Sequence, residues 1–178
     1  MCPETRNIRE ICLQLLNSVL KPHSAAYVAG PLDSGQHYYE LIHNGNNPKV
    51  DIRKKNQKQL TRFAQELRNH LPYPVIDPGP LRVSGWKGSD YASFFLEVID
   101  HYVKEVWFID GWEFSIGATN EFVFCINKGL PCLNESGEKI TPYAGKMLIE
   151  KAVSSIDTLK KDSSKLQLRI QELENVLR

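Results

Sequence analysis

Apolar residues recur every three or four positions along four stretches of the chain, with polar residues between them. This spacing gives an α-helix one apolar face. In the first stretch, for example, Ile8, Cys12, Leu15 and Val19 fall on the same side of a helix. We therefore predict amphipathic helices over residues 7–20, 52–69, 91–102 and 115–127.

Short apolar runs lie between these helices, bounded by residues such as glycine, proline and aspartate, which is typical of buried strands. They cover residues 25–30, 73–77, 106–109 and 130–133. Strands that alternate with helices in this way build a parallel sheet with helices on both faces. The pattern predicts an α/β domain over residues 1–140, which includes the helix at 7–20. The polar segment from 36 to about 50 is expected to be a loop.

The C-terminal segment has a longer periodicity. Its apolar positions alternate steps of three and four, with Ser163 as the single polar intrusion: Ile149, Ala152, Ile156, Leu159, Ser163, Leu166, Ile170, Leu173 and Leu177. Such a heptad pattern is typical of a coiled coil. We expect residues 142–178 to form one long helix that joins copies of the chain into a homo-oligomer, at least a dimer. The alternative is a long helix packed back on its own domain.

Composition excludes several classes of partner. The net charge is +1 and the basic residues are scattered, so we expect no nucleic acid polymer as a partner. The one basic cluster, residues 53–55, is interpreted as a solvated helix start rather than a phosphate clamp. No apolar stretch approaches the roughly 20 residues of a membrane span. Charged residues interrupt the first apolar run, so we expect neither membrane attachment nor a signal peptide.

The four cysteines, Cys2, Cys12, Cys125 and Cys132, form neither a CxxC pair nor a spacing with histidine that suits a metal. Cys125 and Cys132 have apolar neighbours and are interpreted as small buried side chains. We expect a cytoplasmic protein without a bound metal.

In a parallel sheet, ligands bind outside the carboxyl ends of the strands. That rule selects the loops at 30–35, 77–88 and 110–117. The helix after the third loop carries Glu121 among mostly apolar residues. Burial raises the pKa of such a carboxyl group, and the start of a helix lowers it. An ionised, partly desolvated carboxylate suits a nucleophile. From position alone, a glutamate that complements the helix dipole is the alternative.

Ser115 stands where a helix N-cap is expected, and Gly117 lets a ligand approach the free amides of the first turn. Such a site suits a phosphate or a sugar hydroxyl, although capping alone also explains the serine. The segment GPLDSG at 30–35 is either a tight turn or a second binding loop for the same ligand.

Three motifs, in this order, resemble the nucleoside 2-deoxyribosyltransferase-like proteins: YVAGPLDSG at 27–35, GWEFSIGATNE at 111–121 and KGLPCL at 128–133. The likeness is greatest to the small bacterial branch with a GPM-type first loop and a GWxxSxGAxxE segment, and it covers residues 25–135. It implies a flavodoxin-like or Rossmann-like sheet and a double displacement without cofactor or metal. It makes Glu121 the nucleophile and Glu97 the acid that protonates the leaving base, with Asp100 as an alternative. The substrate-binding residues that follow are Gly30, Pro31, Leu32, Ser34, Gly35, Asp110, Trp112, Ser115 and Gly117.

The resemblance implies cleavage of the N-glycosidic bond of a nucleoside or a nucleoside 5′-monophosphate, with transfer to water or to a second base. Serine at position 115, where the transferases tend to carry an acidic residue, favours hydrolysis of monophosphates. The alternative is a nucleotide-binding sensor or assembly module without turnover that signals through the coiled coil. Glu97, in place of the aspartate of the family, and the helical tail favour this alternative.

Overall fold

The structure, a computed structural model, describes residues 3–43, 49–159 and 161–177. It contains a four-stranded sheet in which all strands are parallel, in the order β2-β1-β3-β4. The predicted α/β architecture with a parallel sheet is confirmed, and the strand order is consistent with a Rossmann-like fold. The strands are β1 (Ala25–Ala29), β2 (Val75–Ile76), β3 (Val103–Phe108) and β4 (Cys132–Asn134).

The helices are longer than the sequence predicted at several ends. They are α1 (Pro3–Val19), α2 (Gln36–His43), α3 (Lys49–His70), α4 (Gly88–Tyr102), the short η1 (Trp112–Phe114), α5 (Ile116–Lys128), α6 (Pro142–Thr158) and α7 (Ser164–Leu177). The expectation of a loop after residue 36 is wrong for α2, where the aromatic ring of Tyr39 is buried in the main core. Cys2 and the side chain of Leu177, both used in the sequence analysis, lie outside the described part of the chain.

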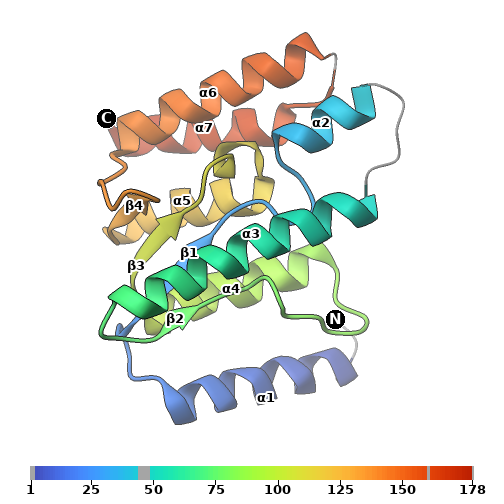
Figure 1. Cartoon of the computed structure of the whole chain (residues 1–178). Coiled ribbons are helices and arrows are strands. Elements are labelled where there is room, and N and C mark those ends of the chain that lie inside the picture. Colours follow the sequence, from blue (N-terminus) through green and yellow to red (C-terminus); the bar gives the residue numbers. More distant parts are fainter. Residues whose placement is uncertain (1–2, 44–48, 160, 178) are drawn as a thin grey trace.

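The side chains of β1 divide the core into two layers. Ala26 and Val28 face α3, whose Leu60, Phe63 and Leu67 complete a smaller core on that side of the sheet. Tyr27 and Ala29 point the opposite way, toward the larger core that α4, α5, α6 and α7 share. Helix α1 covers α4 from outside (Figure 1). The alternation follows from the period of two along a strand.

The C-terminal segment forms a helical hairpin, so the prediction of one long coiled-coil helix is not confirmed. Helix α6 ends at Thr158 and α7 begins at Ser164. Ser163, the polar intrusion in the heptad pattern, lies at the turn: its hydroxyl donates to Asp157 Oδ1, and its carbonyl accepts from the Leu166 amide at 2.9 Å. The heptad positions are buried inside the chain itself, including Ile149, Ala152, Ile156, Leu166 and Leu173.

The hairpin packs closely on α5 (Figure 1). Gly145 of α6 lies against the Phe122 ring of α5, and a Cβ atom at this glycine would stand 2.2 Å from the ring. Lys146 of α6 pairs with Glu174 of α7 at 3.1 Å and joins the two helices at their surface. The apolar stripe that predicted an intermolecular seam therefore serves to attach the hairpin to its own domain.

We predict that Leu166→Asp lowers the free energy of unfolding by at least about 3 kcal/mol, because Leu166 is 1% exposed and its replacement places a carboxylate among apolar side chains. Leu168→Asp is the matched control, since Leu168 lies on the same helix and is 50% exposed. Urea unfolding measures both, with light scattering to follow the molecular mass. Equal stability of the two variants would contradict the hairpin packing.

Candidate functional site

A cavity of about 980 Å³ lies at the carboxyl end of the sheet. Its walls come from the loop after β1 with the start of α2, Arg53 of α3, the loop after β2 with the start of α4, the start of α5, and the start of α7 with the residues just before it. The next strand along the chain after β1, which is β2, lies on one side of β1, and β3 lies on the other side. The order of the strands therefore changes direction at β1, which makes β1 the switch point of the sheet. In sheets of this kind, ligands bind at that point.

Glu121 faces the cavity from the second turn of α5. The hydroxyl group of Tyr27, a residue of β1, donates a hydrogen bond of 2.8 Å to Glu121 Oε1. Burial raises the pKa of Glu121 to about 8, and the hydrogen bond from Tyr27 partly offsets this rise. Burial, followed by the nearby carboxyl group, raises the pKa of Tyr27 well above its usual value, so this tyrosine stays a donor. Glu121 is therefore mostly protonated at neutral pH.

The start of α5 forms a second wall. Ser115 is the N-cap, and its Oγ accepts from the Ala118 amide at 3.4 Å. Ser115, Ile116 and Gly117 all line the cavity. The amides of Ile116 and Gly117 belong to the first turn, where the helix itself supplies no acceptor. A Cβ atom at Gly117 would meet only Ser115 Oγ, at 3.9 Å, so packing does not require a glycine. Because Gly117 has no side chain, a ligand can approach the amides of Ile116 and Gly117.

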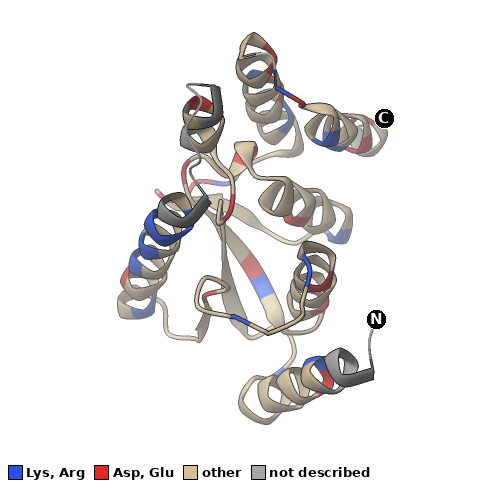
Figure 2. Cartoon of the chain, turned by 90° about the vertical axis from the view of Figure 1, so that its right-hand side faces the viewer, with Lys and Arg blue, Asp and Glu red and all other residues tan. Residues whose placement is uncertain are grey.

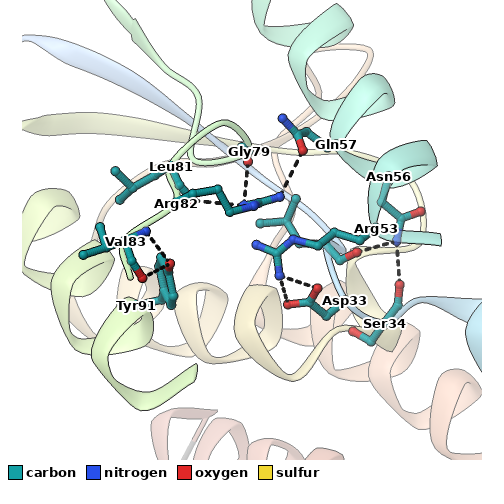
Figure 3. A network of polar contacts seen from close by, with 11 residues as sticks. Asp33, Ser34, Arg53, Asn56, Gln57, Gly79, Leu81, Arg82, Val83 and Tyr91 are labelled. Carbon is teal, nitrogen blue, oxygen red and sulfur yellow. Dashed lines mark hydrogen bonds and ion pairs between the residues drawn. The ribbon is translucent and has the colours of Figure 1, made fainter. Parts of the chain in front are cut away.

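The loop after β1 is held from outside by α3 (Figure 3). Asn56 donates to the carbonyl groups of Leu32 and Ser34 at 3.1 and 2.7 Å. Arg53 forms a salt bridge with Asp33. Gly30, Leu32 and Ser34 line the cavity, as the sequence predicted of binding residues. Pro31 and Gly35 shape the loop without lining the cavity, and Gly35 has a φ of +118°, which favours glycine.

The loop after β2 is also fixed by hydrogen bonds (Figure 3). Arg82 donates to the Gly79 carbonyl at 3.1 Å and to Gln57 of α3 at 3.0 Å. The Tyr91 hydroxyl accepts from the Val83 amide at 2.8 Å. Trp86 packs edge-on against Tyr91, and both rings line the cavity together with other apolar groups of this loop. This wall offers aromatic surface to a planar ligand.

The structure does not bring Glu97 to the cavity. The residues of α4 that line the cavity are Gly88, Ser89, Tyr91, Ala92 and Phe95. Glu97 follows Phe95 by two positions, which turns it about 200° around the helix. Its carboxylate forms a salt bridge with Arg9 of α1 instead. The alternative, Asp100, pairs with Lys128 at 2.7 Å on the surface.

Two further predicted residues lie outside the cavity lining. Trp112 is 3% exposed, and its ring packs between Phe108 and Phe122, with ring centres 4.9 and 4.7 Å away. Asp110 is exposed, and its amide donates to Glu135 Oε1 at 3.0 Å. Asp110 lies in the short loop between β3 and η1, Trp112 is the first residue of η1, and η1 ends just before Ser115.

Sequence reasoning did not select several residues that line the cavity. Tyr27 stood in the first motif only as part of a strand. Arg53 was interpreted as a solvated helix start, yet it lines the cavity. Lys165 and Arg169 belong to the tail, for which a coiled coil was expected. A heptad pattern identifies the apolar face of a helix. It does not indicate which polar residues, such as Lys165 and Arg169, will line a cavity formed with other helices.

Among the described residues, no group of three or more histidine, cysteine, aspartate or glutamate side chains could hold a metal ion. None of the helices in the described ranges is long and apolar enough to cross a membrane. The chain matches no protein-family model, no curated protein and no solved structure.

We predict that Glu121→Gln stabilises the fold increasingly as the pH rises. Glu121 has a pKa of about 8 in the folded chain and an ordinary value of 4.5, so between these values only the folded state keeps the proton. The stability contributed by the neutral carboxyl group is thus lost as the pH rises from 4.5 to about 8. Glutamine does not titrate.

Urea unfolding of the parent protein and of Glu121→Gln, repeated at a series of pH values, measures the free energy of unfolding of each. The stability difference between Glu121→Gln and the parent should be small near pH 4.5, grow to about pH 8 and then level off. Glu10→Gln, at an exposed position on α1, serves as the control and should show no such trend. A difference independent of pH would show that Glu121 is not held in its neutral form.

Proposed function

We propose that this protein cleaves the N-glycosidic bond of a nucleoside 5′-monophosphate through a covalent intermediate on Glu121. The observation that supports this most is the position of Glu121: it faces a large cavity at the switch point of the sheet, is oriented by Tyr27 and stands beside the open start of α5. The motif GWEFSIGATNE, which carries Ser115, Gly117 and Glu121, supplies the chemical expectation.

In the first step, an oxygen atom of the ionised Glu121 attacks C1′ of the sugar. The C1′–N bond breaks, its electron pair stays with the base, and the base takes one proton from water. In the second step, water attacks C1′, the ester oxygen returns to Glu121 as a carboxylate, and the proton of the water passes to solvent. The products are a free base and a sugar 5-phosphate. This is the two-step logic of a retaining glycosidase.

Features of the cavity favour a phosphorylated substrate. The N-cap Ser115 and the open amides beside Gly117 form a site suited to an anion. The aromatic wall of Trp86 and Tyr91 suits the base at the other side of the sugar. Hydrolysis is preferred to base exchange because Ser115 stands where the transferases that the motifs resemble tend to carry an acidic residue.

A nucleotide-binding module without turnover is the second candidate. Two observations favour it: Glu97 pairs with Arg9 instead of facing the cavity, and burial raises the pKa of Glu121 to about 8. A protonated carboxyl group can bind a ligand by hydrogen bonds, and it does not attack carbon. Signalling would then pass through the α6–α7 hairpin, which meets the same cavity.

Base release from nucleotides separates the two candidates. The protein is incubated with ribo- and deoxynucleosides and their 5′-monophosphates, with and without an acceptor base, and chromatography measures the free base. We expect release from at least one monophosphate, faster than from its nucleoside, and loss of at least about a thousandfold in Glu121→Ala because the covalent route is removed. Glu10→Ala is the control.

Two results of this assay would contradict the proposal. Release that persists unchanged in Glu121→Ala would exclude the covalent mechanism. Tight binding of monophosphates without release of any base would identify the module without turnover instead.

The pH dependence of kcat/KM tests whether Glu121 acts in its ionised form. A nucleophile must be ionised, so we expect kcat/KM to rise about tenfold per pH unit below pH 8 and to level off above it. Tyr27→Phe removes the hydrogen bond that lowers the pKa of Glu121, and this should move the rise to higher pH. Tyr73→Phe, outside the cavity, should leave the profile in place. A rate that falls as the pH rises through 8 would mean that Glu121 acts as an acid.

A further inference from the structure

Helix α7 contributes basic side chains to the cavity, although it lies outside the part of the chain that carries the motifs. Lys165 and Arg169 are four positions apart, so they project from the same face of α7. Both line the cavity, as does Lys161 in the turn before the helix. Figure 2 shows basic positions on α7 and along α3, and Arg53 of α3 lines the same cavity.

Arg169 is held against α5, the helix that carries the candidate nucleophile. Its Nη1 donates to Asn120 Oδ1 at 2.7 Å, and Asn120 precedes Glu121 on α5. The same nitrogen atom lies 2.9 Å from Glu172 Oε2. The Nε atom of Arg169 is buried and has no hydrogen-bond partner. The guanidinium group is thus fixed in position while one of its donors stays unused.

Arg53, on the α3 side of the cavity, shows the same feature. Its Nη1 is paired with Asp33, and its Nε is buried without a partner. Within the described ranges, the two Nε atoms are the only buried side-chain nitrogen or oxygen atoms that lack a partner, and both belong to arginines that line this cavity. Unpaired buried donors are costly and rare in native proteins. Because both arginines line the cavity, a ligand with several acceptor oxygens would meet their guanidinium groups there.

The charges of the lining favour an anion. It carries four basic side chains and three carboxyl groups: Arg53, Lys161, Lys165 and Arg169 against Asp33, Glu121 and Asp162. Arg53 is already paired with Asp33, and Arg169 with Glu172, which does not line the cavity. Lys161 and Lys165 then remain against Asp162. Because the pKa of Glu121 is about 8, this group contributes little negative charge at neutral pH. The cavity is therefore net positive although the chain as a whole is nearly neutral.

We propose that Arg53, Lys165 and Arg169 bind the phosphate group of the substrate together with the start of α5, so that the α6–α7 hairpin is a specificity-determining part of the site. Arginine suits this task because its planar fork matches the oxygen atoms of a phosphate group. The identity of the substrate rests on the function proposed above, whereas the anion site itself does not. The hairpin thereby distinguishes nucleotides from nucleosides.

Two kinds of measurement test the site. Calorimetry measures the binding of inorganic phosphate and of a nucleoside 5′-monophosphate to Glu121→Gln, which cannot turn the nucleotide over. Kinetics in the parent background compare kcat/KM for the monophosphate and its nucleoside. Lys165→Gln and Arg169→Gln should each weaken phosphate and monophosphate binding about tenfold, the value of one charged hydrogen bond. The kinetic preference for the monophosphate should fall by the same factor.

Lys151→Gln is the matched control, because Lys151 is an exposed residue of the same hairpin that does not line the cavity. Lys165 is itself exposed, so its replacement should leave the fold intact, and thermal unfolding checks this for every variant. Inorganic phosphate should raise the unfolding temperature of the parent and of Lys151→Gln more than that of Lys165→Gln.

The outcomes separate this inference from the proposed function. If Lys165→Gln and Arg169→Gln match Lys151→Gln in phosphate binding and in the monophosphate preference, the phosphate site is excluded, even where base release persists. If phosphate and monophosphate binding weaken in these variants while no base is released from any substrate, the site is confirmed and the hydrolysis is refuted.

Discussion

The hydrogen bond from Tyr27 to Glu121 joins the first strand of the sheet to the helix that follows the third strand. Burial of a carboxyl group is costly, and Glu121 carries this cost at the switch point between β1 and β3. Tyr27 partly offsets it because its hydroxyl supplies a donor and points away from the core formed with α3. Glu121 is thus oriented by a side chain of the central strand β1.

The α6–α7 hairpin completes this arrangement. Without it, the outer face of α5 would expose Phe122 and its neighbours, and the cavity would lack the wall that carries Lys165 and Arg169. The close approach of Gly145 to Phe122 fixes the position of α6, and the turn at Ser163 directs α7 back across α5. Helix α7 therefore buries apolar side chains on one face and places Lys165 and Arg169 at the cavity on another. The same helix contributes to the stability of the fold and to the binding of the ligand.

Much of the fold could be predicted from the sequence because its signals are local. Alternating apolar runs identify the strands and helices, and the segment from Ser115 to Glu121 places a cap, a glycine and a carboxyl group within two turns of one helix. Properties that depend on the packing of distant segments could not be predicted. All five residues of β1 are buried, so periodicity does not indicate which face Tyr27 takes. The salt bridge of Glu97 depends on the docking of α1, and the position of Arg169 at the cavity depends on the turn at Ser163.

The charges of the cavity affect whether Glu121 can ionise, as the proposed mechanism requires. A nucleophile must be ionised, yet burial raises the pKa of Glu121 to about 8, and a phosphate dianion bound nearby would raise it further. Cations on both sides of the ligand oppose this effect. Arg169, held by Asn120 beside Glu121, and Arg53 across the cavity would compensate the charge of the phosphate group where it is bound. The same side chains that hold the substrate would then keep Glu121 able to ionise, so that binding of the phosphate and activation of the nucleophile depend on one set of residues.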